Sequence, residues 1–145
     1  MIKNYRYGFT LIEIMLVVII IGILAAMLVP NIAGRSDQAR KIAARTDIES
    51  NLSTALDLFH MDTSHYPTTE QGLNALLTKP TASPIPDQWN GPYLKKKKIF
   101  KDPWGHNYVY VSPGTHNTET YDLSSLGPDG VESSDDITNW GNEEK

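Results

Sequence analysis

The sequence predicts an α+β protein, with one long amino-terminal helix followed by a small antiparallel sheet. Two observations favour this fold class. Apolar residues recur at helical spacing through the first half of the chain, whereas the stretch YVYVS at 108–112 alternates and is aromatic and β-branched, which is typical of a strand. We expect ETYDLS at 119–124 to form the partner strand, joined to the first through the turn region PGTHNT.

The long helix is expected over roughly residues 9–61. Every residue from Ile14 to Val29 is apolar or glycine. Counted from Phe9, the run would be about 31 Å long as a helix, close to the ~30 Å hydrocarbon core of a bilayer. Pro30 is expected to kink this helix, and two helices separated at Pro30 are the alternative. Beyond the proline, one apolar stripe is predicted to pack on a domain: Ile48, Leu52, Ala55, Leu56 and Phe59.

The segment after the helix is rich in turn signals. In YPTTEQGLNALL at 66–77, a capping box of Thr68 and Gln71 predicts the start of a short helix. Residues 80–92 contain four prolines and are expected to form an irregular loop. The short helix would bury three leucines on one face: Leu73, Leu76 and Leu77.

Charge is distributed unevenly along the 145 residues. Residues 1–101 carry 12 lysines and arginines against 8 acids, whereas residues 102–145 carry one lysine against 9 acids. The acidic carboxyl-terminal segment excludes a nucleic-acid surface there and suits either solvation or a hard cation. The basic run Lys95–Lys98 is read as a solvated surface, or as a contact for acidic residues of a neighbouring subunit.

The sequence offers no catalytic constellation. No Gly-x-Ser-x-Gly, P-loop or dinucleotide fingerprint occurs, and the four histidines form no pair with metal-ligand spacing. There is no cysteine, so the carboxyl-terminal region cannot be closed by a disulfide. We therefore expect a protein that is not an enzyme.

A carboxylate near the start of the apolar run needs an explanation. Glu13 would cost on the order of 2.5–3.5 kcal/mol at the centre of a membrane helix. A secretory signal peptide would lack its small-x-small cleavage site here, because Ile23 and Leu24 stand where small residues are needed, and a plain membrane anchor gives Glu13 no role. If the chain is cut between Gly8 and Phe9, the new α-amine lies one helical turn before Glu13. In a bundle of identical staggered helices, Glu13 could then pair with the amine of a neighbouring subunit.

A second group of acids lies near the carboxyl terminus, in SLGPDGVESSDD at 125–136. Glycines and a proline allow this segment to bend sharply, so that its four carboxylates would repel one another unless they are solvated or neutralised. Calcium binds six to eight oxygens and would suit them, but the spacing is not that of an EF-hand. On chemistry alone, a calcium site and a solvated acidic loop both remain open.

Several sequence blocks resemble known families. GFTLIE followed by an apolar run is similar to the type IV prepilin signal, which implies cleavage after Gly8 and N-methylation of Phe9 by a prepilin peptidase. The blocks YPTTEQGL, KDPWG and SLGPDG resemble the major pseudopilins of the type II secretion system. This resemblance implies a pilin-like fold with a leader at 1–8, a transmembrane and filament-core helix at 9–30, and a periplasmic domain at 31–145.

The resemblance also implies a site and partners. Pseudopilins of this type close the carboxyl-terminal loop with Ca²⁺, and the loop here is one residue shorter than the commoner pattern, so that Glu132 could replace Ser133 as a ligand. The implied function is a homopolymeric filament, the pseudopilus, which moves exoproteins out through a secretin with an inner-membrane platform and minor pseudopilins. A type IV pilin for adhesion or motility, and a membrane-anchored periplasmic calcium-binding domain, are the alternatives. The implied ligands are Leu126, Asp129, Val131, Ser133, Asp135 and Asp136.

Overall fold

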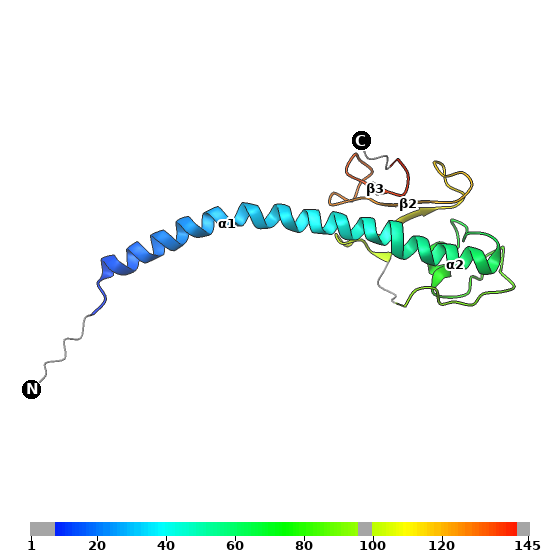
Figure 1. The fold of residues 1–145 in the computed structure, drawn as a ribbon, viewed down its shortest axis with the longest axis horizontal. Helices are drawn as coiled ribbons and strands as arrows, with labels where there is room; N and C mark the ends of the chain where they lie inside the picture. Colours follow the sequence, from blue (N-terminus) through cyan, green and yellow to red (C-terminus); the bar gives the residue numbers. More distant parts are fainter. Residues whose placement is uncertain (1–7, 96–99, 142–145) are drawn as a thin grey trace, which may run out of the picture. The chain divides into compact units, whose positions relative to one another are not determined.

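The computed structural model describes residues 8–95 and 100–141, without the side chains of residues 28–35. The chain divides into two compact units, Met1–Gln38 and Ala39–Lys145. The first unit contains most of the long helix α1, and the second contains the remaining elements (Figure 1). The two units are described separately below.

The predicted long helix is confirmed, because helical backbone is continuous from Leu11 to Thr63. It comprises α1 (Leu11–Thr46), a π-helical segment η1 (Asp47–Leu52) and α2 (Ser53–Thr63). The helix is not interrupted at residue 30, so the alternative of two separate helices is wrong. Hydroxyl groups bind helical carbonyls on both sides of the π segment, with Thr46 Oγ1 donating to Ile42 at 2.9 Å and Ser53 Oγ donating to Glu49 at 2.6 Å.

The first turn of α1 is closed by a capping box. The Thr10 amide lies 3.5 Å from Glu13 Oε2, and the Glu13 amide donates to Thr10 Oγ1 at 3.3 Å. These reciprocal bonds satisfy two amides that an unprotected helix end would leave free. Glu13 therefore has an intramolecular role in the uncut chain that the sequence interpretation did not anticipate.

The side chains of the first helix are exposed throughout residues 8–27. Among the side chains that the structure describes, no helix is both long enough and apolar enough to cross a membrane. The predicted membrane segment, residues 9–30, extends into side chains that lie outside this description.

The sheet of the second unit has three short antiparallel strands in the order β1-β2-β3. These are β1 (Val109–Val111), β2 (Asp122–Ser125) and β3 (Ile137–Thr138). Val109 pairs with Ser124 and Ser125 pairs with Ile137. The first predicted strand is confirmed, whereas the second lies slightly later than expected. The third strand was not predicted, because two residues are too short to carry an alternating pattern.

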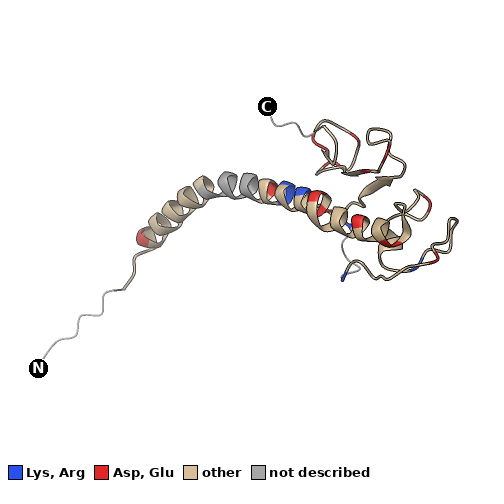
Figure 2. Cartoon of the chain, turned by 45° about the vertical axis from the view of Figure 1, so that its right-hand side comes forward, with Lys and Arg blue, Asp and Glu red and all other residues tan. Residues whose placement is uncertain are grey.

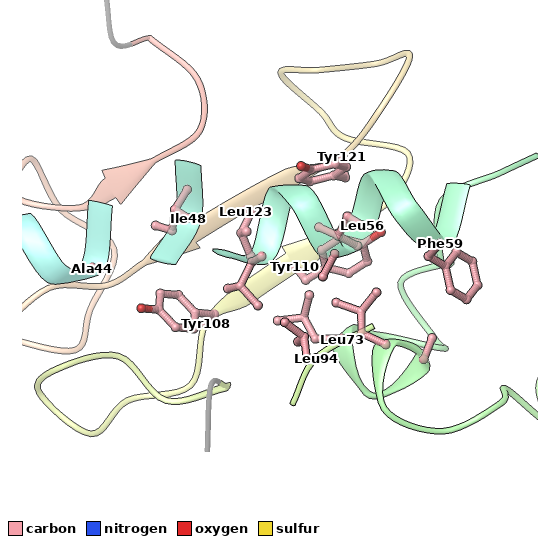
Figure 3. Close-up of a cluster of buried hydrophobic side chains, with 14 of the residues drawn as sticks. Ala44, Ile48, Leu56, Phe59, Leu73, Leu94, Tyr108, Tyr110, Tyr121 and Leu123 are labelled. Carbon is pink, nitrogen blue, oxygen red and sulfur yellow. The ribbon is translucent and has the colours of Figure 1, made fainter. Parts of the chain in front are cut away.

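The core forms where the helix meets the sheet. The predicted stripe on η1 and α2 is confirmed, since all five of its side chains are almost completely buried. Figure 3 shows part of this stripe against side chains from the strands and from the segment around Leu73 and Leu94. Tyrosines of the core keep a polar partner: the Tyr108 hydroxyl donates to Asp47 at 3.1 Å and the Tyr110 hydroxyl to the Pro67 carbonyl at 2.7 Å. Burial raises the pKa of both hydroxyls, so they remain donors.

The predicted short helix is much shorter than expected. Its capping-box bonds exist, with the Thr68 amide bound to Gln71 Oε1 at 3.1 Å and the Gln71 amide to Thr68 Oγ1 at 3.2 Å. They close a turn, however, because Gly72 has a φ of 58° and breaks the helical backbone. Only the 3₁₀ helix η2 (Leu73–Leu76) follows. Leu73 and Leu76 are buried as predicted, and Leu77 packs partly against the core.

Two leucines on α2 test how much the helix–sheet core contributes. Leu56 is fully buried, whereas Leu58, half a turn further on, is 44% exposed. We expect Leu56→Ala to lower the free energy of unfolding by about 2–5 kcal/mol through lost burial and a residual cavity. Leu58→Ala should cost less than about 1 kcal/mol. Denaturant unfolding of the full chain in detergent, followed by circular dichroism, measures both, and equal losses would contradict this account of the core.

Candidate metal-binding loop

The acidic loop occupies residues 126–136 and joins β2 to β3. Two glycines shape it by adopting positive φ angles, +64° at Gly127 and +70° at Gly130. At Gly127 an added Cβ would lie only 3.1 Å from Asp135 Oδ2, so the two limbs of the loop approach each other there. Figure 2 shows that the acidic residues recur through this part of the chain. The sharp bends therefore bring the two limbs of the loop close together.

Ser133 links three of the four carboxylates. Its hydroxyl donates to Asp135 Oδ1 at very close range and lies 3.4 Å from Asp129 Oδ2. Its amide donates to Asp136 Oδ2 at 3.3 Å. The predicted side-chain ligands Asp129, Asp135 and Asp136 are thus gathered around one residue that was itself a predicted ligand.

Asp136 carries the most informative atom of the loop. Its Oδ1 is buried, and no hydrogen-bond partner reaches it. Burial raises the pKa of the Asp136 carboxyl, and the negative charges of Asp135, Asp129 and Glu132 raise it further, against the lowering effect of the Ser133 amide. A buried carboxylate oxygen without a donor, inside a cluster of like charges, is electrostatically unfavourable. A bound cation would remove both penalties.

The other predicted ligands lie in the same loop. Leu126 lines a groove together with Glu132 and Asp136. Val131 is exposed, and its amide donates to Asp129 Oδ1 at 3.1 Å, which fixes the turn between them. Within the described residues, no group of three or more His, Asp or Glu side chains is already arranged to hold a metal ion.

A buried carboxylate that the sequence did not predict holds the start of the acidic loop. Asp102, in the block KDPWG, accepts the amides of Trp104 at 3.0 Å and His106 at 2.8 Å through Oδ1. Its Oδ2 accepts the hydroxyl of Ser125 at 2.7 Å, at the end of β2. Ser125 in turn accepts the amide of Gly127 at 3.2 Å. Asp102 therefore connects the KDPWG turn to the beginning of the acidic loop.

His106 makes a second connection from the same turn. Its Nδ1 lies 3.0 Å from the Gly127 carbonyl, a bond that requires a proton on this nitrogen. An added Cβ at Gly130 would lie 2.9 Å from His106 Nε2, so the ring packs closely on the loop backbone. The sequence contained no signal for this contact, because 21 residues separate His106 from Gly127.

The predicted processing residues lie at the amino end of the described chain. Gly8 and Phe9 precede α1 and are exposed, while Glu13 lies in its first turn, the acidic turn at the amino end of the helix in Figure 2. Lys95 is exposed, and the rest of the run Lys95–Lys98 lies outside the described residues.

An apolar amino-terminal helix that continues into a domain with a small antiparallel sheet is the architecture of pilin-like subunits. The family model for type II secretion system protein G matches residues 31–140, and the prokaryotic N-terminal methylation motif matches residues 3–29. The chain belongs to the type II secretion system protein G family.

Individual relatives agree over nearly the whole chain. The type II secretion system core protein G of Pseudomonas aeruginosa is 48% identical over 145 residues, covering 97% of this chain and 99% of that protein. The core protein G of Vibrio cholerae is 49% identical over 138 residues, covering 92% of this chain and 90% of that protein. The crystal structure of the major pseudopilin from the type 2 secretion system of enterohaemorrhagic Escherichia coli matches with a TM-score of 0.63 at 39% identity, covering 77% of this chain and 95% of that chain.

The support that Asp102 gives to the loop can be measured. Asp102→Asn leaves one acceptor oxygen and introduces an amide group among donors, so we expect the free energy of unfolding to fall by about 2–3 kcal/mol. Ser125→Ala removes one of the three bonds to Asp102 and should cost about 1 kcal/mol.

Asp87→Asn, in the exposed loop at 80–92, is the control and should change stability by less than about 0.5 kcal/mol. Denaturant titrations of the full chain in detergent give all three values. A loss for Asp102→Asn no larger than that for Ser125→Ala would contradict the role of Asp102 as the shared acceptor.

Proposed function

We propose that this protein is a structural subunit of the pseudopilus, the filament by which a type II secretion system moves exoproteins through the outer membrane. The observation that carries the proposal is the apolar surface of α1, whose described side chains from Leu11 to Met27 are all exposed and, apart from Glu13, apolar or glycine. A helix with apolar residues on every side must be covered by lipid or by other helices. A subunit that first lies in a membrane and then packs beside identical helices satisfies this requirement in both states.

The proposed life of the subunit begins with its leader. The basic residues Lys3 and Arg6 would keep residues 1–8 in the cytoplasm, so that the helix spans the inner membrane once and the domain faces the periplasm. A prepilin peptidase would then cut between Gly8 and Phe9 and methylate the new amine. Polymerisation would involve the inner-membrane assembly platform, minor pseudopilins and the secretin. We propose no catalytic role for the chain itself.

Glu13 is proposed to set the register between subunits. Once Phe9 carries a free amine, a positive charge exists at the helix end that the uncut chain lacks. In a filament core with little water, the Glu13 carboxylate of one subunit and the Phe9 amine of its neighbour would each neutralise an otherwise isolated charge. The capping box means that Glu13 also stabilises its own helix, so an experiment must separate these two roles.

The acidic loop is proposed to bind Ca²⁺. Support comes from the buried, unpartnered Asp136 Oδ1 and from the carboxylates gathered around Ser133. Calcium accepts a mixture of carboxylate, carbonyl and water oxygens in flexible geometry. Asp129, Asp135 and Asp136 would supply the carboxylates, and Ser133 with the carbonyls of Leu126 and Val131 would supply neutral oxygens. In a chain without cysteine, the ion would close the end of the domain.

The calcium proposal makes a prediction for thermal stability. Saturating calcium should raise the melting temperature of the full chain in detergent, because a ligand that binds only the native state stabilises it by mass action, by about 2.7 kcal/mol at 100 times the dissociation constant. Asp135→Ala should abolish most of this increase in melting temperature. Differential scanning calorimetry with calcium and with a chelator measures the effect.

Two further variants make the result specific. Asp87→Ala removes an exposed acid from another loop and should retain the full calcium response. Asp136→Asn should lose the response but, without calcium, melt no lower than the wild type, because the raised pKa of Asp136 means that its ionised form is unfavourable in the native state above that pKa. A wild-type melting curve that is the same with calcium and with chelator would overturn the calcium proposal.

The role of Glu13 in assembly is tested by a pair of substitutions. Glu13→Gln can still close the capping box, since glutamine serves at this position, but it carries no charge. Glu13→Ala removes both functions. If charge pairing sets the register, both variants should be processed normally and both should form at least about tenfold less filament, the factor that ~1.4 kcal/mol per subunit contact corresponds to.

Filaments sheared from cells that express the whole secretion system can be quantified by immunoblot, and amino-terminal sequencing of membrane fractions reports processing. Normal assembly of Glu13→Gln with failure of Glu13→Ala would assign Glu13 to the helix cap and refute pairing. Wild-type chains that still begin at Met1 in cells with active peptidase would refute the filament proposal itself.

A further inference from the structure

Asp122 on β2 holds the loop that connects β1 to β2. Its buried carboxylate accepts the amides of Thr115 at 2.7 Å, His116 at 2.8 Å and Asn117 at 2.9 Å, and the Thr115 hydroxyl at 2.9 Å. Burial alone would raise the pKa of Asp122, but these donors lower it far below its usual range. An added Cβ at Gly114 would lie 2.5 Å from Asp122 Oδ1, so the loop backbone also wraps closely around the carboxylate.

The same carboxylate orients the ring of His116. The His116 Nδ1 lies 3.0 Å from Asp122 Oδ2, so Asp122 binds both the ring and the backbone amide of His116. The fixed ring stacks on Trp140, with centroids 4.3 Å apart and planes only 8° from parallel. A residue of the β1–β2 loop thus holds a residue that follows the acidic loop in sequence.

The segment between the acidic loop and Trp140 is short and is bound to the same strand. β3 has only two residues, paired with Ser124 and Ser125. Asn139 extends this contact: its amide donates to the Leu123 carbonyl at 3.0 Å, and its Oδ1 accepts the Leu123 amide at 2.9 Å. Since Asp136 directly precedes β3, whatever fixes residues 137–140 also fixes the end of the acidic loop.

A groove joins the two features. It has a volume of about 320 Å³ and is lined by His116, Asp122 and Trp140 together with Leu126, Glu132 and Asp136 of the acidic loop. Both sets of residues therefore line the same groove.

We propose that Asp122, His116 and Trp140 form a latch that holds residues 135–140 on the sheet and so positions Asp135 and Asp136 to bind a divalent cation. The proposal rests on the proposed calcium role of the loop for its purpose, but the latch itself consists of contacts within the chain. Asp122 acts as an anchor and not as a ligand, because its oxygens are already occupied by donors from residues 115–117. His116 and Trp140 are positioning residues.

The experiment compares three histidine variants of the full chain in detergent. His116→Ala removes the stack and the bond to Asp122, whereas His116→Phe keeps an aromatic ring against Trp140. His60→Ala is the matched control, because His60 is also an exposed ring stacked on an aromatic residue, Tyr66, at 4.6 Å, but on α2. Two quantities are measured: amide hydrogen exchange without calcium, and calcium affinity by titration calorimetry.

His116→Ala should accelerate exchange at residues 135–140 and weaken calcium binding, each by roughly two- to tenfold, the factor to which the energy of an aromatic pair corresponds. Exchange at the amides of Tyr93 and Tyr108, which donate to the carbonyls of Leu76 and Phe100 outside this segment, should stay unchanged. His116→Phe should recover most of both losses, and His60→Ala should show neither. Faster exchange confined to residues 135–140 distinguishes a latch from a contact that merely stabilises the whole domain.

The remaining outcomes are separable. Unchanged exchange in His116→Ala overturns the latch, whatever the loop binds. Faster exchange at residues 135–140 with an unchanged calcium affinity overturns the positioning role. A wild-type chain that binds no calcium refutes the calcium proposal and with it the positioning of ligands, and the exchange experiment, recorded without calcium, then decides by itself whether the latch holds the segment.

Discussion

The packing of one helical stripe on a very small sheet is the interaction on which the rest of the second unit depends. The strands β1, β2 and β3 have three, four and two residues, and such short strands do not form a stable sheet in water by themselves. Leu123 from β2 and Ile137 from β3 are buried in the same core as Ile48, Leu52 and Leu56. The helix therefore provides the apolar surface against which the strands, and the loops between them, can be ordered.

Two buried carboxylates hold irregular segments of this chain together, a role that disulfides have in many small secreted domains. Asp102 and Asp122 each collect several donors from a turn that has no regular secondary structure of its own. Each also reaches across to another segment, Asp102 to Ser125 and Asp122, through His116, to Trp140. An ionised acceptor makes stronger hydrogen bonds than a neutral one, which suits it to holding irregular backbone. The acidic loop lies between these two anchors.

The sequence predicted the features that depend on local periodicity and on local turn chemistry. The stripe on the long helix repeats at helical spacing, and the bonds of the Thr68–Gln71 capping box follow from four consecutive residues. β3 could not be predicted, because its two residues form a strand only by pairing with β2. The roles of Asp102 and Asp122 were not predicted, because each carboxylate binds the amides of a nearby turn and also links that turn to a residue further along the chain, Ser125 for Asp102 and, through His116, Trp140 for Asp122. The four histidines have no metal-ligand spacing, and nothing in the sequence predicts that His106 contacts the loop backbone or that His116 stacks on Trp140.

The long hydrogen bonds of the Thr10–Glu13 capping box have a consequence for the order of events at the helix end. At 3.5 and 3.3 Å both bonds are long, so they stabilise the helix end but can be exchanged for shorter ones. The exposed carboxylate of Glu13 is thus held only weakly by its own helix. If the chain is cut between Gly8 and Phe9 as proposed, the Phe9 amine of a neighbouring subunit would be a stronger partner for Glu13 and would displace the Thr10 amide at small energetic cost. The proteolytic cut would then act as a timing signal, because it creates the competitor that releases Glu13 from its own chain.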